Sequence, residues 1–226
     1  MRKKAIYVLA VLAILLLVRN IHRIMLEVPD DAAQGPIARI IYFHVPAAFT
    51  AFTGFFVALI ASVMYLVTKN LKYDSLAVAV TEVSLAFATV NLVTGPIWAR
   101  IIWGIWWTWD ARLTSMLFCF LLYLSYLALR PALEEPTQRA RISAVFSIFA
   151  FADVPIVWFS IEWFRTQHPA PVLRGSGYMD PFMKSTMYWN WPALMLVATI
   201  LILLRLRQEQ MRLEIDGLRR MAHAVQ

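Results

Sequence analysis

Six long apolar segments constrain the fold of this chain more than any other feature of its sequence. Most of them approach or exceed the roughly 20 residues that a helix needs to cross the core of a bilayer. Of the 226 residues, 61% are hydrophobic and 15% are charged, which is typical of an integral membrane protein. The segments lack the alternating polarity of membrane β-barrel strands, so they predict transmembrane helices.

The sequence therefore predicts an all-α integral membrane protein, with one domain over residues 1–226 and six helices in a single bundle. A tryptophan-rich loop is expected over 99–112 and a charged C-terminal tail over 205–226. The predicted spans lie near residues 5–26, 42–67, 75–98, 113–129, 142–162 and 187–204.

The first segment has two interpretations. Its basic start, Met1 to Lys4, and the short apolar run to Val18 also resemble the front of a signal peptide. No small-residue cleavage site follows, and the run ends at Arg19 and Asn20. We therefore favour a retained anchor whose arginines reach the membrane interface.

The distribution of basic residues predicts the orientation of the six spans. The termini and the loops on their side carry 13 of the 21 Lys and Arg residues, and the opposite side carries 8. Because basic residues are enriched in cytoplasmic loops, both termini are expected in the cytoplasm. The basic residues of the outer face would suit an anionic ligand held there.

The segment from Trp103 to Arg112, read WGIWWTWDAR, is the most unusual part of the predicted outer face. It holds four indoles within seven residues, and all nine tryptophans of the chain fall at this face. Membrane anchoring normally places tryptophan at both interfaces, so anchoring explains neither the density nor the one-sidedness. Such a surface suits a large, flat, apolar ligand.

Two histidines are expected beside this loop. His44 begins the second predicted span, and His168 lies in the third outer loop. A pair of imidazoles from different elements is what axial ligation of a haem iron requires. A single loop histidine is more often solvated or hydrogen-bonded than a ligand, so the spacing alone leaves both interpretations open. Nearby arginines such as Arg100, Arg112 or Arg165 could pair with haem propionates.

The spans themselves hold few groups that could do chemistry. Glu82 and Asp153 are functional candidates because ionisable residues inside a membrane are costly, although Asp153 could equally pack the kink expected at Pro155. Thr94-Gly95-Pro96 predicts a local unwinding before the loop. The single cysteine, Cys119, excludes an internal disulfide, and the sequence has no phosphate-binding loop, so an ATP-driven step would belong to a partner.

The loop resembles the WWD signature of haem-handling membrane proteins. Within this group, the length and six-span layout are similar to those of the CcmC family, the haem exporter protein C family of cytochrome c biogenesis. The related CcmF and CcsA families are longer and have additional spans. The residues that carry the resemblance are Trp103, Gly104, Trp107, Trp109, Asp110, Arg112, Leu113 and Thr114. The resemblance implies that haem is bound by Trp103, Gly104, Trp106, Trp107, Trp109, Asp110 and Arg112.

The resemblance implies a binding and transfer subunit that is not an enzyme. It implies that His44 and His168 are the axial ligands of haem b, held without covalent bonds, and that the four loop tryptophans form an aromatic platform. It also implies delivery of haem to the chaperone CcmE, within an ABC-type complex of the ATPase CcmA, the membrane subunit CcmB and the small subunit CcmD. The expected location is the bacterial inner membrane, or its mitochondrial equivalent, with the functional loops facing the periplasm.

Three other functions remain open from the sequence. The chain could be a haem-translocating permease whose route is lined by Glu82 and Asp153. It could be an electron-carrying membrane cytochrome, although such proteins place their histidines around buried haem. It could also be a structural subunit that the aromatic residues merely anchor.

Overall fold

The computed structural model describes residues 2–170 and 179–224, which are almost entirely helical and contain no β strand. Six helical segments of this part are long and apolar enough to cross a membrane, as predicted, and α5 and α6 together make the fifth. The helices are α1 (Arg2–His22), α2 (Ile41–Thr68), α3 (Leu71–Ile102), α4 (Ala111–Leu129), α5 (Pro136–Phe151), α6 (Asp153–Trp163) and α7 (Pro181–Ala224). Short helices lie at Arg23–Glu27, Pro36–Ile40 and Arg130–Ala132.

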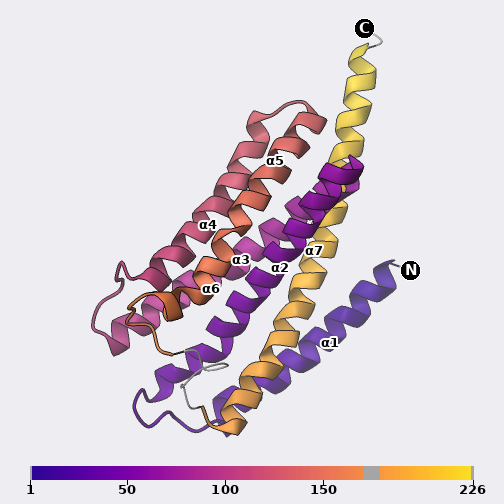
Figure 1. The fold of residues 1–226 in the computed structure, drawn as a ribbon. Helices are drawn as coiled ribbons and strands as arrows, with labels where there is room; N and C mark the ends of the chain where they lie inside the picture. The colour runs from indigo at the N-terminus through magenta and orange to yellow at the C-terminus, as the bar shows by residue number, and fades with distance from the viewer. Residues whose placement is uncertain (1, 171–178, 225–226) are drawn as a thin grey trace.

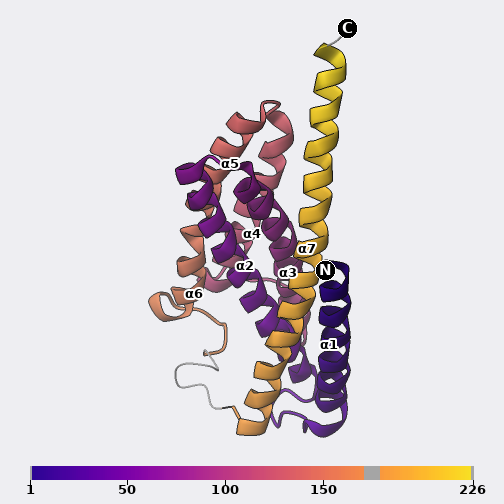
Figure 2. The ribbon, with the colours of Figure 1, turned by 90° about the vertical axis from the view of Figure 1, so that its right-hand side faces the viewer.

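The helices α2 to α6 form the body of the bundle, and α7 packs against α2 and α3. Helix α1 lies at the edge, where its main neighbour is α7 (Figures 1 and 2). The connections α1–α2 and α3–α4, the end of α6 and the start of α7 share one end of the molecule, drawn towards the bottom of Figure 1. This is the grouping of loops that the alternation of six spans predicts.

The core of the bundle depends on small residues where α2 and α3 meet. A Cβ atom added at Gly54 of α2 would lie 1.9 Å from Oγ of Ser84 in α3, so any larger residue there would displace the Ser84 side chain. Such contacts let two membrane helices approach closely and gain packing energy. The side chain of Phe55 then stacks on Tyr123 of α4, with the ring centroids 3.7 Å apart. Cys119 is buried in the same cluster.

Several helices extend beyond the predicted spans. Helix α3 continues to Ile102, which shortens the tryptophan loop to residues 103–110, and α7 continues as one helix to Ala224. The predicted unwinding at Thr94-Gly95-Pro96 is wrong, because α3 runs through Pro96 without a break. A proline removes only one backbone donor, and packed membrane helices tolerate that loss. The fifth span does break, at Ala152, between α5 and α6.

Ionisable side chains at the other end of the bundle form ion pairs. Glu82 of α3 accepts hydrogen bonds from Arg205 of α7, which also pairs with Glu209 at 3.2 Å. Asp74 and Arg130 form a buried two-bond pair, with N–O distances of 2.7 and 2.8 Å. These contacts tie α3 to α7 and to the end of α4, which gives Glu82 a structural role.

Candidate functional site

The loop over residues 103–110 begins with a tight turn and ends with a helix cap. Gly104 has a φ of 77°, a left-handed conformation that glycine adopts without steric cost, and its carbonyl oxygen accepts a hydrogen bond from Arg100. Asp110 is the N-cap of α4, where its carboxylate accepts the Leu113 N–H at 2.9 Å. The glycine and the aspartate of the motif therefore fix the two ends of the loop.

The indoles of this loop differ in exposure. Trp106 is 59% exposed and Trp109 is 77% exposed, whereas Trp103 and Trp107 are partly buried. Trp103 packs edge-on against Trp98 with centroids 5.0 Å apart, and Trp107 packs edge-on against Trp109 at 5.8 Å. Two indoles thus anchor the loop, and two remain available to a flat ligand.

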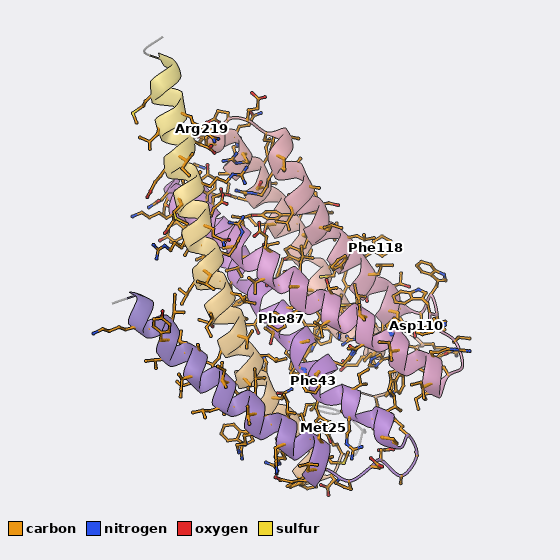
Figure 3. The ribbon with its side chains drawn as sticks, turned by 180° about the vertical axis from the view of Figure 1, so that it is seen from behind. Met25, Phe43, Phe87, Asp110, Phe118 and Arg219 are labelled. Atoms are coloured by element: carbon orange, nitrogen blue, oxygen red, sulfur yellow. The ribbon has the colours of Figure 1, made fainter. Side chains whose placement is uncertain are left out.

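Asp110 also holds the loop that carries His168. Its second carboxylate oxygen accepts the hydroxyl proton of Thr166 at 2.9 Å, and the Thr166 hydroxyl oxygen accepts the backbone N–H of His168 at 3.0 Å. A chain of hydrogen bonds therefore connects the motif aspartate to the backbone of the candidate ligand. Figure 3 labels Asp110 at the same half of the bundle as Phe43, the neighbour of His44, and far from Arg219.

His44 lies in the first turn of α2, which other elements hold in place. Pro46 has no N–H, so the carbonyl oxygen of Tyr42, four residues earlier, lacks its helical partner. Asn190 of α7 donates a hydrogen bond to this oxygen, and Asn20 of α1 contacts Asn190 in turn. Three helices therefore fix the backbone on which His44 is mounted.

Both ring nitrogens of His44 have partners on α3. Nδ1 lies 2.9 Å from the Thr94 hydroxyl oxygen, which itself donates to the carbonyl oxygen of Val90 at 2.7 Å. Because that hydroxyl proton is already used, the imidazole donates through Nδ1–H. Nε2 then carries the lone pair, and it accepts a hydrogen bond from the Asn91 amide at 3.1 Å.

His168 has the same protonation pattern. Its Nδ1 lies 2.9 Å from the carbonyl oxygen of Pro169, which can only accept, so Nδ1 carries the proton and Nε2 the lone pair. Partial burial lowers the pKa of His168 to about 4, and the nearby positive charge of Arg112 acts in the same direction. The imidazole is therefore neutral near pH 7, which is the form that binds a metal.

Arg112 brings a positive charge to both imidazoles, and the two imidazoles also lie close enough to interact electrostatically with each other. The Arg112 guanidinium donates to the carbonyl oxygen of Val157 in α6, so it is held at the base of the loop. Two neutral imidazoles, a fixed cation and exposed indoles thus gather at one end of the bundle. This set can bind a planar anionic ligand that contains a metal.

Some outer basic residues have other roles. Arg39 pairs with Asp30 and donates to two backbone carbonyls, and Arg23 donates to Ser185 and lies 4.0 Å over the ring of Phe182. These contacts hold the α1–α2 connection and the start of α7. Arg23 and Arg39 therefore stabilise the fold, and Arg100, Arg112 and Arg165 stay the candidates for pairing with haem propionates.

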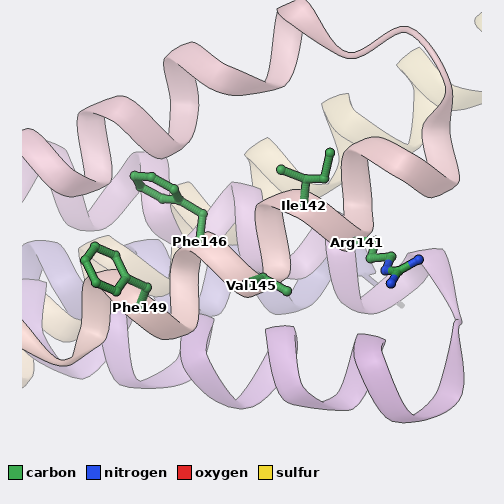
Figure 4. A pocket seen from close by; sticks show the side chains of 5 residues that line it. All are labelled: Arg141, Ile142, Val145, Phe146 and Phe149. Carbon is green, nitrogen blue, oxygen red and sulfur yellow. The ribbon is translucent and has the colours of Figure 1, made fainter.

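A shallow hollow lies elsewhere, on the side of the bundle (Figure 4). It is lined along α5 by Arg141, Ile142, Val145, Phe146 and Phe149. Val145 and Phe149 are well exposed, as expected for side chains that face lipid. The five lining residues include no histidine, so this hollow lacks the ligand type that the tryptophan end provides.

Three residues of the site were not singled out for it by sequence reasoning. Asn91, Thr94 and Thr166 contact residues that lie 47, 50 and 56 positions away along the chain. No spacing rule connects such positions, because the packing of separate helices and loops brings them together. Part of the third outer loop, residues 171–178, lies outside the described residues.

The fold and the site define a multi-pass helical membrane protein with two neutral histidines beside an exposed tryptophan loop at one end. The family model of "Heme exporter protein C", CcmC, matches residues 1–225. The chain therefore belongs to the heme exporter protein C family.

Individual relatives agree with this assignment. Heme exporter protein C of Bradyrhizobium diazoefficiens is 36% identical over 215 residues, which are 94% of this chain and 81% of that protein. The protein of the same name from Escherichia coli K12 is 34% identical over 180 residues, or 79% of this chain and 73% of the relative. A cytochrome c biosynthesis ccmC-like mitochondrial protein of Marchantia polymorpha, itself named as putative, is 36% identical over 140 residues, 62% of this chain and 59% of that protein.

Proposed function

We propose that this chain binds haem b non-covalently at the tryptophan end of the bundle and delivers it to a periplasmic haem chaperone for the maturation of c-type cytochromes. The observation that carries the proposal is the matched state of His44 and His168. Each imidazole has its proton on Nδ1, held by an oxygen atom, and its lone pair on Nε2. An oxygen partner on the second nitrogen is the usual arrangement of a metal-binding histidine.

The other residues of the site supply orientation and charge. The exposed faces of Trp106 and Trp109 contact the macrocycle, while Trp103, Trp107 and Gly104 set the shape of the loop. Arg112 is the main propionate partner, because it is the cation that acts on both histidines. Asp110 does not touch the ligand and instead positions His168 through Thr166.

The location of the site at the end of the bundle suits the transfer of haem to another protein. A platform at the end of the bundle leaves one edge of the macrocycle accessible to a recipient, which must displace at least one histidine. The chain is then a binding and transfer subunit and not an enzyme. Its partners are the chaperone CcmE, the ATPase CcmA, the membrane subunit CcmB and the single-span CcmD, and the ATP-driven step belongs to CcmA.

The excess of basic residues on the side of the termini supports an orientation in the bacterial inner membrane. With 13 of the 21 basic residues on that side, the termini face the cytoplasm and the tryptophan loop faces the periplasm. The ligand is then held where a periplasmic chaperone can reach it.

The test is to load the chaperone in cells that lack their own copy of this chain. We expect wild type to restore haem-bound chaperone, and His44→Ala and His168→Ala each to reduce it strongly. Asp180→Asn, which alters the cap of α7 at the same end, serves as the matched control. Undiminished loading with both histidine variants would refute the proposal. Haem efflux from vesicles that contain this chain alone would instead favour a permease.

A further inference from the structure

We infer that Asn91 competes with the haem iron for Nε2 of His44, and that Thr94 keeps this nitrogen in its ligating form. Asn91 and Thr94, which lie about one turn apart on α3, would then change haem affinity in opposite directions. The inference rests on the proposed function, because it takes His44 as an iron ligand. It assigns to α3 the control of how easily His44 binds and releases haem.

The contact of Asn91 occupies the direction in which iron would bind. Its amide nitrogen lies 3.1 Å from Nε2 of His44 and 3.2 Å from the carbonyl oxygen of the same residue. One amide group has two protons and can serve both acceptors. Asn91 is 8% exposed, so water does not readily replace these contacts. Iron can bind Nε2 only after the amide has given up one of its two hydrogen bonds.

The imidazole has little freedom to turn away from the amide instead. The Thr94 hydroxyl holds Nδ1 at 2.9 Å on the same face of α3. A Cβ atom added at Gly95 would lie 3.3 Å from Cε1 of His44, so the ring rests directly against the α3 backbone. With the ring held on this side, the exchange must occur by movement of the Asn91 side chain. Its second bond, to the His44 carbonyl oxygen, can persist during the exchange.

The two contacts have opposite consequences for iron binding. In Asn91→Leu the amide is absent, so Nε2 of His44 does not have to lose a hydrogen bond before it binds iron. The substitution should therefore raise haem affinity about fivefold, the effect of one neutral hydrogen bond. Removal of the Thr94 hydroxyl leaves Nδ1 without its hydrogen-bond partner. The imidazole ring is then held less firmly, and its Nε2 becomes less basic. Thr94→Val should therefore lower haem affinity roughly tenfold, at the lower end for an outer partner of a metal ligand.

The experiment compares haem titration and haem release to apomyoglobin for purified wild type, Asn91→Leu, Asn91→Ala and Thr94→Val. Thermal unfolding shows whether the leucine side chain disturbs packing, and in that case Asn91→Ala replaces Asn91→Leu in the comparison. Thr89→Val is the matched control for Thr94→Val, because the Thr89 hydroxyl makes the same type of bond to its own helix, to the carbonyl oxygen of Leu85. Slower release from both Asn91 variants and faster release from Thr94→Val are expected.

A second readout needs no haem. Diethylpyrocarbonate acylates neutral imidazole nitrogens, and mass spectrometry gives the rate at each histidine. In the haem-free chain, His44 should react several-fold faster in Asn91→Leu than in wild type, while the rate at the exposed His22 stays constant.

The outcomes separate this inference from the proposed function. Weaker or unchanged haem binding in the Asn91 variants would overturn the inference, as would an unchanged labelling rate at His44. Loss of the inference leaves the proposed function in place if His44→Ala still removes the low-spin haem spectrum. If His44→Ala retains that spectrum, His44 is not a ligand and both fail.

Discussion

The hydrogen-bonded chain from Asp110 through Thr166 to His168 can be tested by removing its middle member. Thr166→Val keeps the size and shape of the side chain but deletes two hydrogen bonds, one to a carboxylate and one from a backbone N–H. It leaves the Asp110 cap of α4 intact, since that bond uses the other carboxylate oxygen. The variant therefore loosens the His168 loop without disturbing the start of α4.

The size of the effect follows from the two bonds. A bond to a charged acceptor contributes about 1.5–3 kcal/mol and a neutral one about 1 kcal/mol, and partial exposure at this loop lowers both. A net loss of about 1.5 kcal/mol in the free energy of ordering the loop corresponds to roughly a tenfold loss of haem affinity. We expect that loss in Thr166→Val, with part of the bound haem becoming high-spin as one ligand dissociates.

Haem titration followed by absorbance measures both quantities. Asp110→Ala removes only the bond to Thr166 from this chain, so its loss of haem affinity should be no larger than that of Thr166→Val, and it should also lose about 1 kcal/mol of stability from the missing cap. The double variant should bind haem no more weakly than Thr166→Val, because that single change already removes both bonds of the chain. Asp180→Asn, at the cap of α7, should leave the spectrum unchanged. Wild-type affinity and spectrum in Thr166→Val would refute the idea that this chain positions His168.

Three further predictions concern the stability of the fold and the contacts of the site. Asn190→Leu should lower the free energy of unfolding by about 1–3 kcal/mol in thermal or denaturant unfolding, because it leaves the carbonyl oxygen of Tyr42 buried without a donor; unchanged stability would contradict this. Asp74→Asn or Arg130→Met alone should each cost about 3–5 kcal/mol, while Asp74→Leu combined with Arg130→Met recovers most of the loss; additive losses would exclude a coupled pair. Gly95→Ala should weaken haem binding several-fold without unfolding the chain, because the added methyl group pushes on the imidazole at 3.3 Å, and equal titration curves would argue against that contact.

The sequence predicts the number and type of the helices because the length of an apolar segment is set by the membrane. It does not predict where the helices end, because a helix can continue beyond the membrane interface when the charged residues that follow also favour a helix. Helix α7 shows this, because its alternating charges after Leu204 keep the helical spacing to Ala224. The predicted break at Pro96 failed for a related reason, because the surrounding bundle supports the helix there.

The candidate site divides in the same way. His44, His168 and the tryptophan loop are predictable from residue type and from their place at the ends of spans. The residues that orient them are not, because Asn91 and Thr166 are ordinary polar residues whose roles arise only from tertiary packing. Asp110 lies between the two cases, since the motif marks it but only the structure shows that it contacts the His168 loop.

The most direct test of the account is the optical spectrum of the purified chain after haem loading, recorded beside His44→Ala and His168→Ala. We predict a low-spin, two-histidine spectrum for wild type that each variant loses or converts to high-spin. A low-spin spectrum that persists in both variants would show that other residues bind the iron, and failure of the wild-type chain to bind haem would contradict the proposed function itself.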